Sequence, residues 1–471
     1  MSQKYDCIII GAGMSGLAAG IRLSMYNKKV LILEKHSISG GLNSYYARGK
    51  RKFDVGLHAL TNFVNPTDKG KPFNKLMKQL RIPYEEFKLH PQNFSLIHYP
   101  ETKLKFNNDI EFLRNEIASQ FPTQIDGFDK LLEHIKNYDE VNLANETIMA
   151  KDVVKNFIND ELLLDMIFCP LLIYGSAWEN DMDFSQFVIM FKSIFLEGFS
   201  RPVGGVRTII DLLLKKLEAN GCEIKFKTEV TKIISNNKKI VGVEINGAQI
   251  LECDSILSSM GLPETYAIIE SDKKLLESPR KGNLSFCESI LFTDKKPSEL
   301  GLDATIIFYN NRSRYHYQKP QTLFDNSSAV VCLPNNFTHD EFDEGLIRVT
   351  NIANFDHWNS LLNTSKEEYK LKKDEVFEQS RLILKDCGLN SNYNVLYKDI
   401  FTPTTIKRYT QHFDGTVYGS IDKSRNGKTP VDGLFICGTD QGFLGIVGSM
   451  LSGISMANLH VLSATNSGSN T

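Results

Sequence analysis

Three glycines and one glutamate near the N-terminus have the types and spacing that bind a dinucleotide. Gly11, Gly13 and Gly16 form the pattern G-x-G-x-x-G, and Glu34 follows them. Gly11 permits a tight turn, Gly13 lets a pyrophosphate approach the main chain, and Gly16 lets a helix pack closely on the preceding strand. A carboxylate at the spacing of Glu34 accepts hydrogen bonds from a ribose diol and disfavours a 2′-phosphate. The chemistry predicted here is the binding of an adenylated dinucleotide.

Two strands and a helix must position these residues. The apolar run 5–10 predicts a strand buried on both faces of a parallel sheet, 14–25 predicts a helix, and 29–33 predicts a second strand. The amides at the helix start, at Met14 and Ser15, then face an anion. The alternative is a turn that merely tolerates glycine; the flanking strands and the acid favour the nucleotide site.

The composition is that of an ordinary globular protein. The chain has 471 residues, of which 42% are hydrophobic and 23% are charged, and this length allows two or three domains. A net charge of -2 provides no attractive field for nucleic acid, and the eight scattered cysteines form no C-x-x-C pair, which argues against a disulfide framework or a metal site. The sequence shows no secretory signal and no uninterrupted apolar span of about 20 residues. We therefore expect a cytoplasmic protein, or one attached to the surface of a membrane.

A second glycine pair lies in the segment 35–60. Gly40 and Gly41 follow Glu34 closely, and an Asp-Val-Gly turn at 54–56 comes shortly after them. This arrangement resembles the flavin amine oxidase and phytoene desaturase superfamily, in which the glycine pair passes its amides along the FAD pyrophosphate. The resemblance implies FAD as the cofactor. Most members have Arg where this chain has Asn43, and this departure leaves no charge for a contact at that position.

The segment 201–262 carries the same resemblance. It predicts a turn at 202–205, a helix at 206–219, and then strands at 222–226, 230–234 and 240–245, with a hairpin at Asn246-Gly247. In the superfamily, the residue that matches Val230 contacts the adenine end of FAD through its backbone, and the stretch 258–261 ends a strand beside the cofactor. The alternative is a plain meander in the core.

The C-terminal stretch 433–457 predicts a buried strand at 434–437 and a helix of small residues that starts near 445–448. The amides and partial positive charge of such a helix start suit the pyrimidine end of an anionic reduced flavin. In the superfamily, the matching strand ends in a glycine and an acidic residue that hold the ribityl chain and phosphate. Here Thr439 intervenes and Asp440 comes one residue late, so either residue could make that contact.

Together these segments imply a set of contacts to FAD. The expected contact residues are Gly11, Gly13, Met14, Ser15, Gly16, Glu34, Lys35, Gly40, Gly41, Leu42, Asn43, Gly56, Leu57, His58, Val230, Ser258, Met260, Gly438, Thr439, Asp440, Gly445, Ile446 and Val447. The expected fold is α/β, with a Rossmann-type FAD-binding domain like that of glutathione reductase, built from βαβ and β-meander parts. We expect this domain to be discontinuous, comprising 1–102, 201–262 and 429–464. On the pattern of the superfamily, 103–200 and 263–428 form an inserted α+β substrate domain, and 465–471 is expected to be disordered.

Five phenylalanines between 184 and 199 stand on one face of a predicted helix. They could pack a core, or they could line a tunnel for a long hydrocarbon, and pockets and cores use the same residue types. The predicted substrate pocket comprises Tyr174, Phe187, Phe191 and Phe195. Lys192 and Glu197 lie off this aromatic face, and we expect solvated or helix-pairing roles for them.

Two short segments narrow the resemblance. The segment 401–420, and V-G-L-H-A-L around His58, are similar to the carotenoid isomerase and retinol saturase branch. His58 follows the turn at 54–56, which in relatives runs toward the reactive face of the flavin. An imidazole there can donate or accept a proton when hydride moves, which makes His58 the candidate catalytic residue. A purely structural histidine is the alternative.

These features predict an oxidoreductase that transfers hydride between FAD and a carbon–carbon bond of a long apolar substrate, such as a polyisoprenoid, carotenoid, retinoid or lipid. Desaturation, saturation and isomerisation all remain open. The chain has one dinucleotide fingerprint, so electrons from a desaturation would pass to oxygen or a quinone, and a saturation would need an external reductant. A flavin-dependent amine oxidase and a non-catalytic FAD-binding scaffold are the alternative functions.

Overall fold

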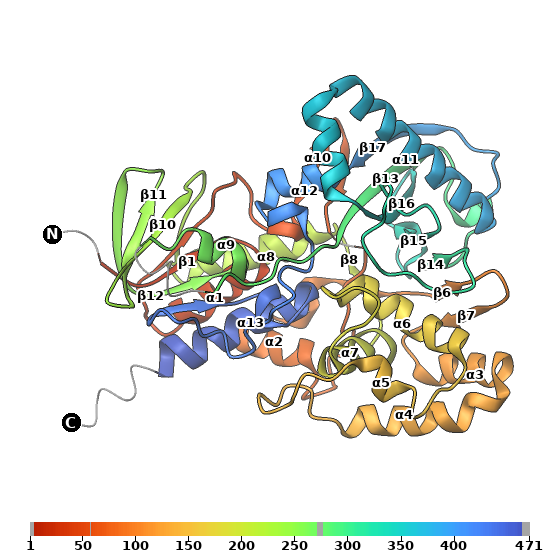
Figure 1. Ribbon diagram of the computed structural model, residues 1–471, viewed down its shortest axis with the longest axis horizontal. Helices are drawn as coiled ribbons and strands as arrows, with labels where there is room; N and C mark the ends of the chain where they lie inside the picture. The colour runs from red at the N-terminus through yellow and green to blue at the C-terminus, as the bar shows by residue number, and fades with distance from the viewer. Residues whose placement is uncertain (1–3, 57, 271–276, 464–471) are drawn as a thin grey trace.

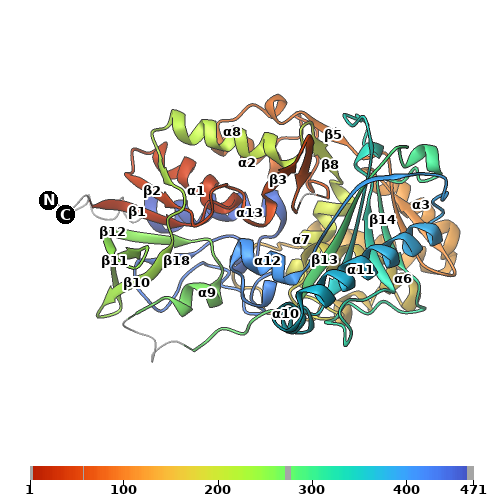
Figure 2. The ribbon, with the colours of Figure 1, turned by 90° about the horizontal axis from the view of Figure 1, so that it is seen from above.

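Two seven-stranded sheets organise the chain, which the computed structural model describes over residues 4–56, 58–270 and 277–463 (Figure 1). The expected contact residue Leu57 and the expected tail 465–471 lie outside the described residues. Figure 2 shows the first sheet and the second sheet side by side, with α12 (Pro403–Thr410) between them.

The first sheet has a parallel part and an antiparallel extension. Its first strand is apolar on both faces: Cys7 and Ile9 pack against helices, whereas Ile8 and Ile10 pack against the extension. This burial on both sides is what a continuous apolar run predicts. The parallel strands are β1 (Tyr5–Ile10), β2 (Val30–Leu33), β9 (Glu223–Lys225), β12 (Gln249–Ser258) and β18 (Leu434–Ile436), and β10 (Val230–Asn236) and β11 (Lys239–Ile245) extend the sheet from β12.

Four helices cover one face of the first sheet, and α9 (Leu262–Ala267) follows β12 directly. Helices α1 and α13 pack closely enough that a Cβ on Gly453 would lie 2.0 Å from the carbonyl oxygen of Ser15. Only glycine permits this approach, which packs the start of α1 against the C-terminal half of α13. The four helices are α1 (Met14–Ser24), α2 (Pro72–Leu80), α8 (Val206–Ala219) and α13 (Gly445–Met456), and α8 has the predicted bounds.

The second sheet separates two layers of helices (Figure 1). Its strands, in order, are β17 (Val395–Phe401), β13 (Ser285–Thr293), β16 (Gly345–Ala353), β15 (Ser328–Cys332), β14 (Ile306–Asn310), β6 (Ser95–His98) and β7 (Lys103–Phe106). One face carries α10 (Phe355–Thr364) and α11 (Lys366–Asp386), and the other carries α3 (Ile110–Gln120), α4 (Ile125–Asn137), α5 (Ala150–Val154), α6 (Glu161–Gly175) and α7 (Phe184–Phe191). The remaining strands form two ribbons, β3 (Tyr45–Arg48) with β4 (Arg51–Asp54) and β5 (Leu89–Pro91) with β8 (Ser200–Pro202).

Two details differ from the prediction. We expected the first domain to continue to residue 102, but the chain already joins the second sheet at β6. This strand pairs with β14 and β7. The helix predicted through the phenylalanine stripe changes at Lys192, where a wider π-helical segment, Lys192–Leu196, follows α7. Such π-helical segments are frequent at functional sites.

Among the described residues, one helical stretch, Gly445–Leu462, is long and apolar enough to cross a membrane by length and composition. It contains α13, packs against α1, and is 56% buried within the protein. This burial is typical of a core helix. All eight cysteines are free thiols, and seven of them are buried.

Candidate functional site

The first glycine turn, at Gly11, Gly13 and Gly16, has open space beside its middle glycine. Gly11 has a φ of +96°, and a Cβ on Gly16 would lie 2.1 Å from the carbonyl oxygen of Gly11, so both positions require glycine for the fold itself. Gly13 differs, because no described atom outside Gly13 and its two chain neighbours lies within 4 Å of the position that its Cβ would occupy. Helix α1 begins directly after Gly13, and no side chain of the described residues caps it. The turn therefore leaves room and amides for an anion.

Glu34 lies beside this turn. One of its carboxylate oxygens accepts the amide of Ala12 at 2.7 Å, and the other accepts the amide of His36 at 2.7 Å. Lys35 turns outward to an exposed ion pair with Glu229. The acid thus links the glycine turn to the end of β2, and its contact with a ribose stays a prediction.

The second glycine pair and the turn at 54–56 join the same site. The amide of Gly40 donates to the carbonyl of Ala12 at 2.8 Å, and a Cβ on Gly41 would lie 3.5 Å from the Cα of Gly13. A Cβ on Gly56 would lie 2.4 Å from the carbonyl oxygen of Leu42, so the turn must also approach the pair closely. The first glycine turn, the second glycine pair and the turn at 54–56, all predicted to contact FAD, therefore lie side by side.

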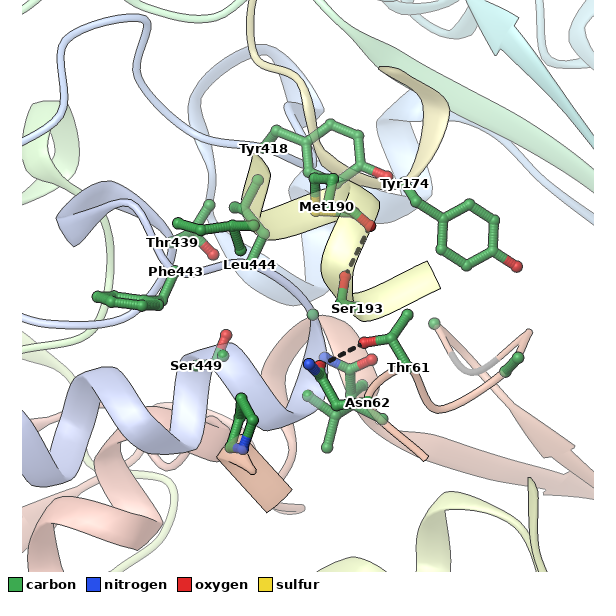
Figure 3. A pocket seen from close by; sticks show the side chains of 18 of the residues that line it. Thr61, Asn62, Tyr174, Met190, Ser193, Tyr418, Thr439, Phe443, Leu444 and Ser449 are labelled. Carbon is green, nitrogen blue, oxygen red and sulfur yellow. Dashed lines mark hydrogen bonds between the residues drawn. The ribbon is translucent and has the colours of Figure 1, made fainter. Parts of the chain in front are cut away.

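A cavity of about 650 Å³ begins where these segments end (Figure 3). Leu42, Asn43 and Gly56 line it from the first domain, together with Gly445 and Ile446 at the start of α13. Helix α13 also begins without a side-chain cap among the described residues. The rest of the wall is mainly apolar and includes Ile173, Tyr174, Ile189, Met190, Leu196, Phe286, Val330, Phe401, Ile406, Val417, Tyr418, Phe443 and Leu444. An apolar chamber therefore opens beside a helix start that favours negative charge.

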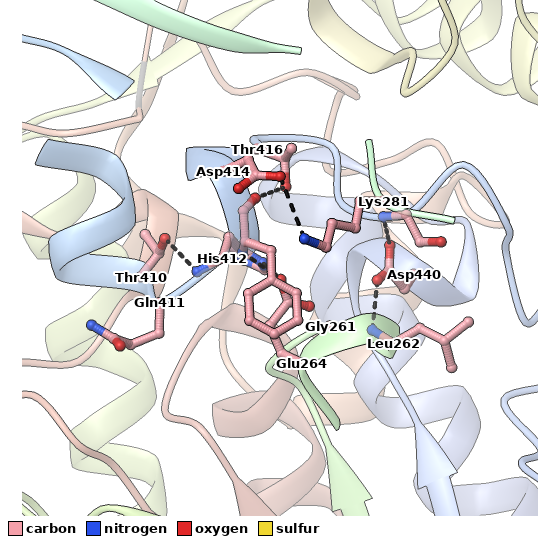
Figure 4. Close-up of polar contacts among 12 residues, drawn as sticks. Gly261, Leu262, Glu264, Lys281, Thr410, Gln411, His412, Asp414, Thr416 and Asp440 are labelled. Atoms are coloured by element: carbon pink, nitrogen blue, oxygen red, sulfur yellow. Dashed lines mark hydrogen bonds and ion pairs between the residues drawn. The ribbon is translucent and has the colours of Figure 1, made fainter. Parts of the chain in front are cut away.

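The structure separates the two residues between which the sequence could not choose. Thr439 lines the cavity, whereas Asp440 is buried and is 1% exposed. The carboxylate of Asp440 accepts a hydrogen bond from the amide of Leu262 at 2.6 Å (Figure 4). It also accepts one from the amide of Ser420 at 2.8 Å and lies 3.1 Å from Nζ of Lys423. Because these donors occupy its oxygens, Asp440 holds the loops around β18 together.

Three further expected contacts also point into the protein core. The hydroxyl of Ser258 is 2.7 Å from that of Thr265, Met260 packs against the core around the β10–β11 extension, and Val447 is fully buried on the helical face of the first sheet. Because these three side chains pack within the protein, we expect only their main-chain atoms to contact a cofactor. Val230 is likewise buried at the start of β10.

The substrate pocket predicted from the phenylalanine stripe needs correction. Tyr174 does line the cavity, but Phe187, Phe191 and Phe195 are almost wholly buried in the core between α6, α7 and the second sheet. The opposite edge of the helix lines the cavity, through Ile189, Met190, Ser193 and Leu196. Core packing therefore explains the aromatic face, because these rings make tilted or edge-on contacts with one another and with Phe106, Phe128 and Phe168.

Lys192 and Glu197, for which we expected solvated or helix-pairing roles, line the cavity. Nζ of Lys192 is 2.7 Å from a carboxylate oxygen of Glu140, and buried Glu197 accepts the side-chain amide of Asn62 at 2.7 Å. Burial raises the pKa of Glu197, although Asn62 and Lys71 partly oppose that shift.

His58 lines the cavity and joins a buried charged group that the sequence did not reveal. Its Nε2 is 3.0 Å from Oε1 of Glu288 and 3.0 Å from the hydroxyl of Thr350. Glu288 in turn accepts Nε of Arg348 at 2.7 Å and Nη2 at 2.9 Å. Arg348 also donates to the carbonyl of Val55 at 2.7 Å, which ties the group to the turn at 54–56.

The charges in this group follow from burial and pairing. Burial lowers the pKa of His58, and the hydrogen bond and charge of Glu288 offset only part of that shift. Burial alone would raise the pKa of Glu288, but Arg348 and His58 outweigh it, so its pKa lies below the usual range. The site therefore presents a neutral imidazole backed by an ionised carboxylate and a guanidinium.

One sequence signal could have found these partners. Glu288 and Arg348 are the charged residues of β13 and β16, in the runs S-F-C-E-S-I-L-F-T and G-L-I-R-V-T-N-I-A, whose other residues are uncharged. A single charge in a strand that is buried along its length requires a partner. Two such strands in one chain predict a buried pair, although they do not predict which histidine joins it.

The chain is similar to known proteins over nearly its whole length. The family described as NAD(P)-binding Rossmann-like domain matches residues 9–80. Prolycopene isomerase of Daucus carota is 25% identical, and the match covers 97% of this chain and 80% of that protein. All-trans-retinol 13,14-reductase of Danio rerio is 19% identical, and that match covers 97% of this chain and 86% of the reductase. The resemblance to the flavin amine oxidase and phytoene desaturase superfamily, nearest the carotenoid isomerase and retinol saturase branch, is confirmed.

Solved structures share the fold. An oxidoreductase from Methanosarcina mazei superposes with a TM-score of 0.66 at 17% identity, covering 98% of this chain and 100% of that one. A putrescine oxidase variant superposes with a TM-score of 0.63 at 16% identity, covering 98% and 100%. The predicted Rossmann-type α/β fold with an inserted domain is confirmed.

Proposed function

We propose that this chain is an FAD-dependent oxidoreductase that acts on a carbon–carbon bond of a long apolar substrate, such as a polyisoprenoid, carotenoid or retinoid. The observation that carries the proposal is the mainly apolar cavity that opens directly on the second glycine turn and the start of α13. The relatives named prolycopene isomerase and retinol reductase support this substrate class. The protein would act without nucleic acid, and the direction of electron flow is left to experiment.

The residues present fit FAD. The open space at Gly13 and the uncapped start of α1 suit a pyrophosphate, Glu34 suits a ribose, and the start of α13 suits the electron-rich end of a flavin ring. The remaining main-chain contacts would come from Gly40, Gly41, Val230 and Gly438, with the Thr439 side chain on the cavity wall. When bound, FAD supplies hydride acceptance and donation, and the protein supplies orientation, dryness and electrostatics.

Gly13→Ala should separate cofactor binding from folding. Gly13 has a φ of -73° and a ψ of 178°, which alanine adopts without strain, and its Cβ would meet no described atom beyond its two chain neighbours within 4 Å. We expect the free energy of unfolding of the flavin-free protein to change by less than about 1 kcal/mol, while the added methyl blocks the pyrophosphate and lowers flavin affinity at least tenfold. Urea unfolding and flavin absorbance measure the two quantities.

Gly16→Ala is the matched control for this substitution. Its Cβ would lie 2.1 Å from the carbonyl oxygen of Gly11, so it should disturb the fold with or without flavin. A Gly13→Ala protein that binds FAD as tightly as the unchanged chain would contradict the placement of the pyrophosphate.

His58 is the residue that we assign to proton transfer. Within the described part of the chain, Nε2 carries both hydrogen bonds of the ring, to Glu288 and Thr350, so Nδ1 is the nitrogen that can exchange a proton with a substrate. The neutral imidazole would take the proton that leaves the substrate as hydride leaves the neighbouring carbon. Glu288 and Arg348 orient the ring and stay charged.

The test is turnover by the purified holoprotein on panels of carotenoids, retinoids and unsaturated lipids, under oxidising and reducing conditions. We expect a change in the absorbance of at least one polyene. Peroxide release with polyamines, and no change in any polyene, would favour an amine oxidase instead. Bound flavin that neither reduces nor reoxidises with any donor would indicate a scaffold and would overturn the proposal.

A further inference from the structure

The guanidinium of Arg201 is buried and only partly paired. Arg201 lies on β8 and is 7% exposed, and its Nη2 donates to a carboxylate oxygen of Asp54 at 2.6 Å. Its Nε and Nη1 are buried and have no hydrogen-bond partner among the described residues. Buried polar groups in proteins are almost always hydrogen-bonded, because a buried donor without an acceptor is costly. Arg201 therefore requires an acceptor besides Asp54.

A small cavity adjoins this guanidinium. Its volume is about 20 Å³, and a cavity needs about 10–15 Å³ to hold one occupant of the size of water. The wall comes from β4, β8 and the second sheet with the turn that precedes β16. The lining residues are Lys52, Phe53, Asp54, Arg201, Ile290, Pro334, Leu346 and Arg348. The cavity therefore has room for one small occupant beside Arg201.

The charges of the wall favour a negative occupant. Three lining side chains are cations, Lys52, Arg201 and Arg348, and one is an anion, Asp54. Glu288 pairs with Arg348 at 2.7 Å from outside the wall, so an excess of one positive charge remains even when Glu288 is counted. An anion in the cavity would balance that excess.

Water fits the hydrogen-bonding groups of the wall less well than an anion does. A water molecule must also donate its own O–H groups, whereas a small anion only accepts. The carboxylate of the wall is already engaged, because one oxygen of Asp54 accepts from Arg201 and the other accepts the amide of Val206 at 3.1 Å. An occupant that only accepts hydrogen bonds therefore suits the cavity best.

The acidic loop 340–344, which precedes β16, does not supply the missing negative charge. Its Phe342 packs on Arg201, with Cζ 5.5 Å from the ring centroid, but no residue of the loop lines the cavity. Its four carboxylates face other partners or solvent: Asp340 pairs with Lys296 at 2.7 Å, Glu344 pairs with Arg51 at 2.7 Å, Glu341 accepts the amide of Gly204 at 2.7 Å, and Asp343 is exposed.

We propose that this cavity binds one small monovalent anion, of the size of chloride, beside Arg201 and Arg348. The anion accepts hydrogen bonds from Arg201 and balances the excess positive charge of the wall. Because β4 and β8 meet the second sheet at this cavity, the bound anion stabilises the junction between the turn at 54–56 and the strand that carries Arg348. The inference does not depend on which reaction the protein performs.

The first test is urea unfolding of the full-length holoprotein, with excess FAD, in sodium chloride and in sodium gluconate at the same ionic strength. Gluconate is too large for the cavity and serves as the reference anion. A ligand that binds only the folded state stabilises it, so we expect saturating chloride to lower the equilibrium constant for unfolding about tenfold relative to gluconate. Unfolding that does not differ between the two salts would overturn the proposal.

Two variants locate the site. Arg201→Lys keeps a cation for Asp54 but lacks the Nε and Nη1 groups, so the chloride effect should fall from about tenfold to less than about twofold. Lys52→Met, at the exposed side of the wall, should weaken chloride binding about threefold or more. Lys50→Met is the matched control, because Lys50 is also exposed but does not line the cavity, and it should leave the chloride effect unchanged. Flavin content reports that each variant is folded.

Bromide tests the position of the anion directly. In holoprotein crystals soaked in sodium bromide, we expect an anomalous-scattering peak in the cavity beside Arg201. A cavity without that peak, or a chloride effect that Arg201→Lys leaves intact, would overturn the assignment. These readouts are separate from turnover on the substrate panels. A protein that acts on polyenes but binds no bromide here would refute this inference alone, and one that binds bromide but acts on no polyene would refute the proposed function alone.

Discussion

His58→Asn is expected to turn over substrate about 10² to 10⁴-fold more slowly, the usual contribution of a positioned acid or base, while keeping its flavin. Asparagine cannot carry the proton that Nδ1 of His58 is assigned to take. The hydrogen-bonded partners Glu288 and Thr350 lie on strands of the second sheet, so the fold should survive the change. Steady-state rates and the flavin absorbance of the purified variant measure the two expectations.

The pH dependence gives this prediction a second readout. Burial lowers the pKa of His58 from its ordinary value of about 6.5, so the neutral form predominates at neutral pH. If the neutral form accepts the proton, kcat/KM is constant at pH values above the lowered pKa of His58. It falls below that pKa, as the ring becomes protonated. A His58→Asn enzyme that keeps the rate and the acid limb of the unchanged enzyme would show that His58 is a structural residue.

The first domain could be predicted because its signals are local. Gly11 to Gly16, the helix 206–219 and the hairpin at Asn246-Gly247 are each defined by neighbours within a few residues, and the structure has them where the sequence places them. A backbone position with a positive φ, such as Gly11, favours glycine, so the residue type in the sequence indicates the turn.

The cavity wall could not be predicted because burial alone does not distinguish a core from a chamber. The spacing of Phe187, Phe191 and Phe195 correctly predicts one buried face of a helix. Whether that face meets other side chains or an open space depends on what packs opposite. Here α4, α6 and the second sheet fill that side, and the cavity lies along the edge with Met190 and Leu196.

The pairing of His58 with Glu288 and Thr350 could not be predicted, for a different reason. Glu288 and Thr350 are brought together as directly paired residues of β13 and β16, and both come from a domain remote in sequence from His58. No local pattern encodes such a contact. Asp440 shows a related limit, because the sequence did not reveal that its carboxylate is buried against the amides of Leu262 and Ser420.

Arg348→Met is expected to have the largest effect on stability. Glu288 is 1% exposed, and both of its oxygens are bonded to Arg348, so removing the guanidinium leaves a buried carboxylate with much of its compensation lost. Breaking a buried ion pair from one side costs about 3–5 kcal/mol in the free energy of unfolding. Urea unfolding of the flavin-free protein measures this loss in the free energy of unfolding. Arg280→Met, which breaks the exposed pair with Asp422, should cost at most about 1 kcal/mol.

The same substitution makes a prediction about His58 that a merely structural defect would not. Arg348 lowers the pKa of His58 and Glu288 raises it. Arg348→Met should therefore move the acid limb of kcat/KM to higher pH, because the unpaired carboxylate favours the protonated imidazole. Glu288→Gln should move it to lower pH, because the carboxylate charge is gone and Arg348 remains. Limbs that stay in place, or move in the same direction, would contradict the assignment of this group to the control of a proton on His58.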